Sequence, residues 1–513
     1  MAIKISGNTV IDDSRNITSS GTMSANAYIG DGSQLTNLPG GGNVLEATAS
    51  GTLADGSKVI VNADGTVSVV APVETTGAGA GTPEVFESAD ARFIASTYDS
   101  TNQKVIIAYQ DYGNSSYGTA VVGEVSGNSI TFGTPGVFEY QTIEYISLAY
   151  DSNTGKVVIG YRGGGNGKAR VGTVSGNSIT FGSPTTFESA TSQDIQVESV
   201  GSGKVVIAYQ QGGSPYYGKA RVGTISGTSI SFGTEETFQS AGSAVNISVT
   251  YDSSNNKVVI AYSDGGNSRY GTAIVGTVSG TDITFGTPVV FESAMVFMYG
   301  KATIYDSANG KVVIAYRDVG NSDYGTAVVG EVSGTSISFG TPVVFNSAQS
   351  LYYSAAYDSD NGKVIIAYEG NSDKTAAVVG TVSGTSISFD SPIEFVPTLK
   401  YEISAVYDST NRKIVIAYDD KANSEYGTAF TFSSRTISRN LTEENFIGIS
   451  DGAYSDGQTA TIQLTGAVDD AQSGLTPGQS YYVQNDGTLS ETADNPSVFA
   501  GTALASTKLI VRG

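Results

Sequence analysis

The sequence contains no cysteine, no histidine and no tryptophan. Without cysteine there is no disulfide framework, and the sequence does not indicate whether the protein works in a reducing or an oxidising compartment. Without histidine, nucleophile activation of the Ser-His-Asp or Cys-His type, zinc bound by imidazole and proton transfer through imidazole are all excluded. Any catalysis would therefore have to use carboxylates, tyrosine, lysine or arginine.

Basic residues and long apolar runs are scarce as well. The chain has 27 Lys and Arg against 49 Asp and Glu, a net charge of −22. Such a surface repels a phosphate backbone, so we expect no nucleic-acid partner. No run of about 18 apolar residues occurs, which predicts no membrane insertion. The start of the chain, Met-Ala-Ile-Lys-Ile-Ser-Gly-Asn, lacks the apolar core of a signal peptide. We also expect no cofactor.

One unit of roughly 50 residues is repeated seven times in the middle of the chain, a period typical of β-propellers. Each unit contains the strand Lys-Val-(Val/Ile)-Ile-(Ala/Gly)-Tyr and three further β-rich segments, separated by turns rich in Gly, Asn and Ser. Four strands per unit predict an all-β fold, a seven-bladed β-propeller of four-stranded blades. The marker strand ends at Tyr109, Tyr161, Tyr209, Tyr262, Tyr316, Tyr368 and Tyr418.

The seventh unit lacks its fourth strand. It stops after the third strand, near Phe432, whereas residues 81–86, ahead of the first unit, carry the fourth-strand pattern Gly-Thr-Pro-Glu-Val-Phe. Pairing of this segment with the strand near Ala429 would complete the seventh blade and join the two ends of the ring. Because closure removes two unpaired sheet edges, we expect this N-terminal strand to close the last blade.

Four regions follow from the repeats. Residues 79–433 form the propeller, and residues 1–42 form an N-terminal segment that ends in a glycine triplet typical of a flexible joint. Residues 43–78 are a small β segment, and residues 434–513 are a C-terminal β module. Because closure brings the two ends of the propeller together, these last two regions either pack as one module with the propeller inserted in it or fold separately.

The flanking regions resemble a known group of proteins. Residues 30–39, Gly-Asp-Gly-Ser-Gln-Leu-Thr-Asn-Leu-Pro, and the preceding Ser-Gly-Thr-Met-Ser-Ala-Asn-Ala are similar to segments near the ends of tail-fibre and other virion proteins of tailed bacteriophages. Residues 445–451, 459–464, 474–483 and 500–509 resemble a small all-β module of phage virion proteins, and residues 44–70 resemble what often precedes it. The resemblance implies a virion structural protein whose residues 1–42 attach it to other virion proteins, with a homotrimer as in other fibre-like N-termini.

Variation among the repeats is confined to two of the four connections. The turns between strands one and two (Tyr-Asp-Ser) and between strands three and four (Ser-Gly-Thr/Asn-Ser) hardly change. The connections between strands two and three, and from strand four to the next blade, vary widely. Because successive strands are antiparallel, the two variable connections share one face of the disc. A purely structural ring would not need one diversified face, so we expect this face to bind a partner.

Aromatic residues mark the same face. Of the 30 tyrosines, 18 occupy framework positions of the repeat, where blade packing is the simpler interpretation. Rings in the variable connections suit stacking on sugars or contact with a protein. Packing at the bases of the loops is the alternative for this set, which comprises Tyr112, Tyr140, Tyr145, Tyr216, Phe297, Tyr299, Tyr352, Tyr353 and Tyr401.

Charged residues lie in the same connections. Arg162, Arg269 and Arg317 are candidates to bind a carboxylated sugar, as the arginine cluster of the propeller-shaped sialidases does. However, the Ser-x-Asp-x-Gly-x-Thr-Trp boxes of sialidases are missing. Asp264 and Asp318 are candidates to bind sugar hydroxyls, with Asx turns as the alternative. No calcium-loop motif is present, and we predict no metal site.

Blades two and three depart from the repeat in one further way. Each replaces the usual Thr-Ala-Val with Lys-Ala-Arg, and residues two apart share one face of a strand. The four cations form a docking patch for an acidic partner or pair with nearby glutamates. They are Lys168, Arg170, Lys219 and Arg221.

These patterns favour a non-enzymatic phage virion protein, a tail fibre or receptor-binding component located in the particle. Its propeller would present the variable face to a glycan or protein on the host surface. One alternative is a capsid, head-fibre or baseplate decoration that makes only particle contacts. A second is a glycan-degrading enzyme that uses two carboxylates, such as Asp264 and Asp318.

Overall fold

In a computed structural model, the chain is almost entirely β and divides into two compact units, residues 74–436 and residues 1–73 with 437–513. The structure describes residues 3–5, 8–11 and 43–512 without 75–78, 215, 371–373, 397–398, 435–436, 443 and 495. Side chains before residue 43 and at 72–74, 396, 399–401 and 437–439 are also not described. The predicted attachment segment 1–42 thus lies outside the described residues, apart from the backbone of β1 (Ile3–Ile5) and β2 (Asn8–Ile11).

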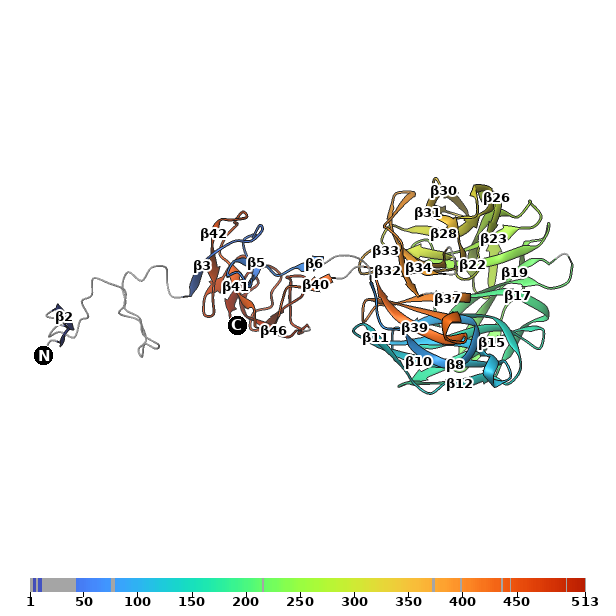
Figure 1. Cartoon of the computed structure of the whole chain (residues 1–513), viewed down its shortest axis with the longest axis horizontal. Coiled ribbons are helices and arrows are strands. Elements are labelled where there is room, and N and C mark those ends of the chain that lie inside the picture. Colours follow the sequence, from blue (N-terminus) through green and yellow to red (C-terminus); the bar gives the residue numbers. More distant parts are fainter. Residues whose placement is uncertain are drawn as a thin grey trace. The chain divides into compact units, whose positions relative to one another are not determined.

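The larger unit is a seven-bladed propeller, as the repeats predict (Figure 1). Each blade begins with a strand near the axis, and each of these first strands lies beside the first strands of both neighbouring blades. The seven neighbours therefore form a closed circle. The first strands are β8 (Glu84–Asp99), β13 (Ile143–Asp151), β17 (Thr185–Gly201), β22 (Ala244–Asp252), β27 (Thr303–Asp306), β32 (Leu351–Asp358) and β37 (Leu399–Asp408).

The second and third strands pair antiparallel in every blade. The second strands carry the Val-Ile core pattern and are buried along almost their whole length. They are β9 (Lys104–Asp111), β14 (Lys156–Gly163), β18 (Lys204–Gln211), β23 (Lys257–Asp264), β28 (Lys311–Asp318), β33 (Lys363–Glu369) and β38 (Lys413–Asp420). The third strands are β10 (Tyr117–Ser126), β15 (Asn166–Ser175), β19 (Gly218–Ser226), β24 (Tyr270–Ser279), β29 (Tyr324–Ser333), β34 (Thr375–Ser383) and β39 (Tyr426–Ser433).

The fourth strand is split into two pieces, and both pair with the third strand. A Gly-(Thr/Ser)-Pro step separates them in most blades, because proline cannot donate to the ladder. The first pieces are β11 (Ser129–Phe132), β16 (Ser178–Phe181), β20 (Ser229–Phe232), β25 (Asp282–Phe285), β30 (Ser336–Phe339) and β35 (Ser386–Phe389). The second pieces are β12 (Gly136–Glu139), β21 (Glu236–Gln239), β26 (Val289–Phe297), β31 (Val343–Gln349), β36 (Ile393–Val396) and the starts of β8 and β17.

The ring closes where the sequence predicts. In β8, Val85 pairs with Thr428 and Glu84 with Ala429 of β39, and β7 (Gly79–Ala80) extends the pairing at Phe432. In Figure 1 the blue β8 lies beside the orange β39 accordingly. The prediction that the N-terminal strand completes the seventh blade is confirmed.

A repeated aromatic contact joins neighbouring blades. A phenylalanine in the outer strand packs on the marker tyrosine of the next blade, with ring centroids 5.1–5.3 Å apart, and on the phenylalanine of that blade's fourth strand at 5.5–5.8 Å. The ring lies directly on the Tyr-Gly glycine: a Cβ on Gly427 would stand 2.4 Å from the Phe86 ring. The phenylalanines are Phe86, Phe138, Phe187, Phe238, Phe291 and Phe345.

The constant face of the propeller is held by hydrogen bonds in its turns. In the first blade the buried Asp99 accepts hydrogen bonds from the backbone amides of Thr101 and Asn102 and from the Asn102 side chain. The tyrosine before this aspartate binds the turn of a neighbouring blade: the Tyr98 hydroxyl lies 2.7 Å from Thr410 Oγ1. These Asx turns explain why the sequence of this face hardly changes between blades.

Both ends of the propeller chain lie on this constant face. β7 precedes β8 at the end of β39 that leads away from the variable loops. Ser434, just beyond β39, donates a hydrogen bond to the Asp358 carboxylate in a Tyr-Asp-Ser turn (2.5 Å). The variable face therefore carries neither end of the propeller chain.

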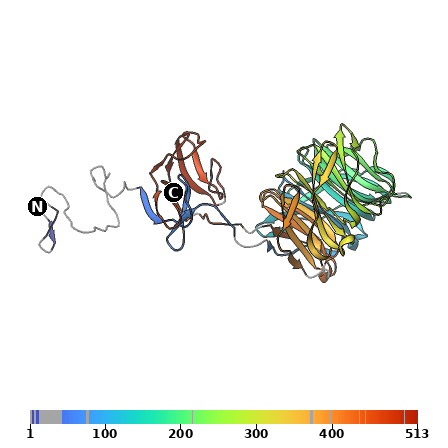
Figure 2. The same cartoon turned by 90° about the horizontal axis from the view of Figure 1, so that it is seen from above.

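The smaller unit is built from both flanks of the propeller, as Figure 2 shows by its blue and red strands. One sheet interleaves β3 (Val44–Thr48), β4 (Lys58–Val61) and β5 (Val67–Val69) with β41 (Phe446–Ser450) and β42 (Thr459–Gln463). The other sheet contains β43 (Val468–Asp469), β44 (Ser480–Val483), β45 (Leu489–Ser490), β46 (Val498–Ala505) and β47 (Lys508–Val511). One buried cluster, including Ile60, Phe446 and Leu509, spans both sheets.

The flanks therefore fold as one module whose chain is interrupted by the propeller. Where the chain passes from one unit to the other, β6 (Pro72–Glu74) pairs with β40 (Ile437–Arg439).

In the part of the chain that the structure describes, no helix is long and apolar enough to span a membrane.

Candidate functional site

A pocket of about 170 Å³ lies on the propeller axis and receives side chains from all seven blades. Its wall contains the same register position of each first strand, near the end where the strand leaves the variable connections. Because this position belongs to the start of the strand, the pocket opens on the variable face. The seven residues are Phe93, Tyr145, Asp194, Asn246, Gly300, Tyr352 and Glu402.

An unusual backbone conformation turns these side chains toward the axis. Phe93, Tyr145, Asp194, Asn246 and Tyr352 have φ between 46° and 53°. The register of the first and second strands shifts at the same place, for example between Arg92 and Ala95, which marks a β-bulge. A left-handed conformation is unfavourable for phenylalanine and tyrosine, although Asp and Asn adopt it more readily, and bulges commonly redirect a side chain at a site. The recurrence of this conformation in five blades indicates that the fold aims this position at the pocket.

Two pairs of aromatic rings form opposite parts of the wall. Phe93 and Tyr145, from blades one and two, have ring centroids 5.5 Å apart. Tyr299 and Tyr352, from blades five and six, have centroids 5.8 Å apart, and Phe297 stacks on Tyr299 at 5.5 Å. Four aromatic rings thus line the pocket together with isoleucines and the buried Met298.

Two carboxylates lie between the aromatic pairs. Asp194, from blade three, accepts a hydrogen bond from the backbone amide of Asn246 at 2.7 Å. Burial raises the pKa of the Asp194 carboxyl despite this bond. Burial, and then the negative charge of Asp419, raise the pKa of Glu402 in blade seven well above its usual range. Both carboxyls are therefore held in surroundings that disfavour their charge.

Burial and the nearby carboxylates raise the pKa values of two pocket tyrosines. Burial, followed by the charges of Asp194 and Glu402, raises the pKa of Tyr145. Burial, followed by nearby acidic groups that include Glu402, raises the pKa of Tyr352 to about 12. The phenols consequently stay neutral at ordinary pH and can donate hydrogen bonds to a ligand.

Arginines support the aromatic walls from outside the pocket. The Arg162 guanidinium lies 4.7 Å from the Tyr145 ring centroid and pairs with Glu144. The Arg317 guanidinium lies 5.3 Å from the Phe297 centroid and pairs with Asp323 at 2.8 Å. Neither arginine lines the pocket, and nor does Arg269, which is exposed. The charges of Arg317 and Arg269 nevertheless act on the pocket residue Tyr299, where they oppose the rise of its pKa by burial. Sugar binding by the three arginines stays a prediction.

The remaining predicted aromatic residues divide into three groups. Tyr112, Tyr140 and Tyr216 are exposed on the variable loops, at 54%, 71% and 43% of their full surface, so they are available to a partner. Tyr353 was predicted on the loop face but is fully buried, and its hydroxyl donates to the Ser350 carbonyl at 2.9 Å. It is a core residue, so the prediction was wrong there. The Tyr401 side chain lies outside the described residues.

The predicted aspartates have local structural roles. Asp318 caps a short 3-10 helix, η2 (Val319–Asn321), by accepting from the Asn321 amide. Asp264 accepts from the Gly266 amide at 2.9 Å and from the Gln239 side chain at 2.5 Å. Both make the contacts of the Asx-turn alternative, and sugar binding by these aspartates stays a prediction. Among the described residues, no group of three acidic side chains could hold a metal ion.

The predicted docking patch is paired internally. Lys219 and Arg221 both contact Glu235, and Arg221 also donates to the Gly233 carbonyl at 3.0 Å. Arg170 donates to the Gly182 carbonyl at 2.6 Å, and Lys168 Nζ lies 3.7 Å from the Glu139 carboxylate. Because these partners neutralise or satisfy the cations, the alternative of internal pairing holds, and a patch for an acidic partner is not supported.

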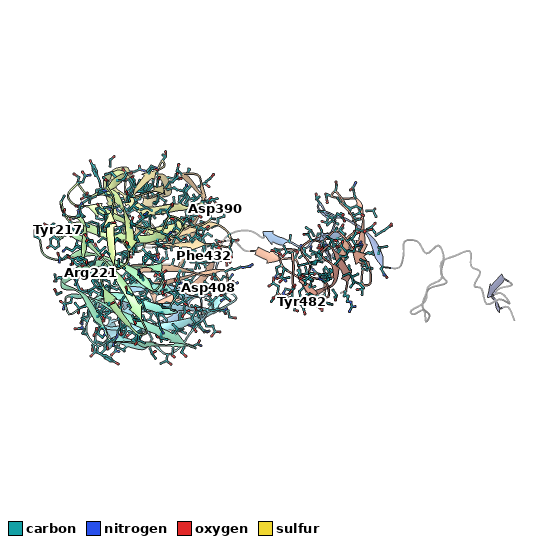
Figure 3. The ribbon with its side chains drawn as sticks, turned by 180° about the vertical axis from the view of Figure 1, so that it is seen from behind. Tyr217, Arg221, Asp390, Asp408, Phe432 and Tyr482 are labelled. Carbon is teal, nitrogen blue, oxygen red and sulfur yellow. The ribbon has the colours of Figure 1, made fainter. Side chains whose placement is uncertain are left out.

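Five of the seven pocket positions were not predicted from the sequence: Phe93, Asp194, Asn246, Gly300 and Glu402. A signal was present, because aligning the repeats places all seven pocket positions in one column. That column changes from blade to blade, whereas the next one is mostly isoleucine. This column lies at the start of a strand and not in the variable connections, so variation of the loops alone does not predict it. Figure 3 shows Tyr217, in a variable connection, and Asp408, in a constant turn, on opposite sides of the propeller.

Comparisons with known proteins support the fold and do not go beyond it. No protein-family model and no curated protein matches the chain. The BP39L lectin from Burkholderia pseudomallei is similar over 69% of this chain and 99% of its own, with 10% identity and a TM-score of 0.51. The β-propeller domain of Myceliophteria thermophila Cps50 (Swd1) covers the same shares with 8% identity and a TM-score of 0.46. A leech intramolecular trans-sialidase covers 70% of each chain with 11% identity and a TM-score of 0.39.

Proposed function

We propose that this chain is a non-enzymatic virion component of a tailed bacteriophage, a tail fibre or receptor-binding protein. Its propeller binds a glycan or protein on the host surface through the variable face. The resemblance of residues 30–39 and of the C-terminal module to phage virion proteins supports a location in the phage particle. The propeller fold is a suitable scaffold, since a similar propeller is a lectin, although fold alone does not decide function.

The observation that carries the proposal is the contrast between the two faces. Both ends of the propeller chain and the hydrogen-bonded turns occupy the constant face. The opposite face carries the diversified loops, the exposed tyrosines and the axial pocket. The variable face carries neither chain end, and its loop sequences can change without disturbing the blade framework. Such a face is suited to recognition of a partner.

Adsorption to bacteria tests this proposal. Labelled protein is added to a panel of intact candidate host cells and to a glycan array. The double variant Tyr299→Leu/Tyr352→Leu removes two rings from the variable face, and the matched control Tyr98→Leu/Tyr251→Leu removes two half-buried rings from the constant face. We expect the first variant to lose adsorption and the control to keep it. Equal adsorption of both variants would leave the proposed recognition face without support.

A particle-decoration role is the alternative that the same resemblance allows. A density map of the virion separates the two roles, because a receptor-binding propeller has its variable face free in the particle. A variable face covered by other virion proteins would favour decoration.

The two pocket carboxylates favour one other function, hydrolysis of a glycan. A carboxyl with a raised pKa, such as Asp194 or Glu402, is suited to act as a general acid. This function predicts release of reducing ends from host polysaccharide and loss of that release in Glu402→Gln. Binding without any such release supports the non-enzymatic proposal.

A further inference from the structure

We infer that the axial pocket is a binding site for a small organic ammonium group, such as the trimethylammonium of choline or the protonated amine of an amino sugar. The inference deepens the proposed function, and it rests on that function only for the surface that presents the group. It follows from the order of side chains around the axis, from the size of the pocket and from the charges near it.

The order around the pocket alternates aromatic and acidic residues. Blades one and two supply Phe93 and Tyr145, and blade three supplies Asp194. Blades five and six supply Tyr299 and Tyr352, and blade seven supplies Glu402. Each carboxylate therefore separates the two aromatic pairs. Aromatic faces attract cations through their quadrupole, and aromatic cages are the usual sites for alkylammonium groups.

The charges of Arg317 and Arg269 act on Tyr299 and oppose the rise of its pKa by burial. Neither arginine lines the pocket, and Arg317 is paired with Asp323. The other charges near the pocket also leave room for a cation. Lys301, next to the pocket residue Gly300, is paired with Glu198 at 3.0 Å. Arg92 pairs with Asp90 and lowers the pKa of Glu402, but the net shift of that carboxyl remains upward. No lysine or arginine lines the pocket among the described residues. A bound ammonium group would stabilise the two carboxylates in their charged forms, which burial disfavours.

The size of the pocket selects a single small group. Its volume is about 170 Å³, and an apolar cavity of about 150 Å³ accommodates benzene. A trimethylammonium group or one end of a sugar ring fits this space, whereas an oligosaccharide chain does not. The remainder of a larger receptor would lie over the exposed loops, where Tyr112, Tyr140 and Tyr216 are located.

Two matched ligand pairs test the inference on the purified full chain. Choline is compared with 3,3-dimethylbutan-1-ol, which has the same shape without the charge, and glucosamine is compared with glucose. Binding is measured by saturation-transfer NMR on the ligand protons and by calorimetry. We expect the cation to bind at least about tenfold more tightly than its neutral partner in one pair. The pair that discriminates identifies whether the group comes from a choline-type headgroup or from an amino sugar.

Variants connect the discrimination to the pocket. Asp194→Asn/Glu402→Gln should lose most of the preference for the cation, because only the aromatic faces still favour it. Tyr299→Leu should weaken binding of the cation more than binding of its neutral partner. Glu331→Gln, on the outside of blade five with half of its side chain exposed, is the control and should change nothing. If the double variant does not fold, Tyr299→Leu and the ligand pairs on the unaltered chain still decide.

Three results would overturn the inference: no saturable binding of either cation, equal binding of cation and neutral partner in both pairs, or full discrimination in the double variant. The assay uses neither virions nor cells, so its outcome is separate from adsorption to hosts. Host adsorption without ammonium binding would refute the ligand and leave the proposed function. Ammonium binding without adsorption to any host would support the ligand and refute the proposed function.

Discussion

Removing the Phe86 side chain should destabilise the propeller at the point where its two ends meet. The ring of Phe86 lies 5.2 Å from that of Tyr109 and 5.7 Å from that of Phe132, and only 6% of the residue is exposed. It also covers Gly427 of the last blade. Replacing a buried phenylalanine with alanine costs about 3–5 kcal/mol, of which each aromatic contact contributes about 0.5–1.5 kcal/mol. We therefore expect Phe86→Ala to lower the free energy of unfolding by about 3–5 kcal/mol.

Phe291→Ala is the matched control, because Phe291 makes the same contact between blades four and five, inside the continuous chain. Its ring lies 5.2 Å from Tyr316 and 5.5 Å from Phe339, and 8% of the residue is exposed. Since the two environments match, the two variants should lose similar stability if the closing blade is packed as tightly as the others.

Guanidinium unfolding followed by near-ultraviolet circular dichroism measures this loss. The signal reports the propeller, because 26 of the 30 tyrosines lie in residues 74–436 and tryptophan is absent. Hydrogen exchange gives a local test at Thr428 and Ala429, which pair with the closing strand. A loss below about 1 kcal/mol for Phe86→Ala, beside a loss of about 3 kcal/mol or more for Phe291→Ala, would refute ring closure.

Three further outcomes are expected. Tyr305→Phe removes the 2.7 Å hydrogen bond to Ser254 on the constant face and should cost about 0.5–1.5 kcal/mol in denaturant unfolding. Asp194→Asn/Glu402→Gln should weaken the pH dependence of stability: raised carboxyl pKa values stabilise the fold below about pH 4, and this contribution is lost as pH rises through them, at about 1.4 kcal/mol per pKa unit. The stability of the unaltered chain minus that of the variant should therefore fall from pH 4 to pH 8, and a constant difference would contradict the shifts. Glu235→Gln removes the charge that Lys219 contacts and should lower the melting temperature, which thermal unfolding measures.

The framework was predictable because each of its parts recurs. The marker tyrosines, the outer-strand phenylalanines and the Tyr-Asp-Ser turns appear in nearly every blade, so the repeat alone indicates strand order and closure. Their constancy has one physical cause, namely that each makes a contact with the neighbouring blade. A side chain packed between two blades of the same structure has the same neighbours throughout the ring, and the residue at that position therefore stays the same.

The binding site was only partly predictable, for two physical reasons. Asp264 and Asp318 lie in variable loops, but their side chains accept backbone hydrogen bonds within those loops, which the sequence does not distinguish from ligand binding. Tyr353 follows Tyr352 directly, and only the backbone decides which of the two enters the pocket. A bulge at Tyr352, with φ of 46°, turns that side chain to the axis and leaves its neighbour in the core.

The bulge directs the side chain toward the axis whatever the residue type. Phe93, Asp194 and Asn246 share one backbone conformation although their side chains have nothing else in common. The surrounding strands therefore impose the conformation, and each blade can change its contribution to the pocket without changing the fold. Blade five defines the limit of this freedom. A Cβ on Gly300 would stand 2.3 Å from the Tyr353 carbonyl oxygen, so no side chain fits there, and Tyr299 supplies the ring from the preceding position. The pocket can thus be diversified at six positions of the ring, and at the seventh the neighbouring strand is too close.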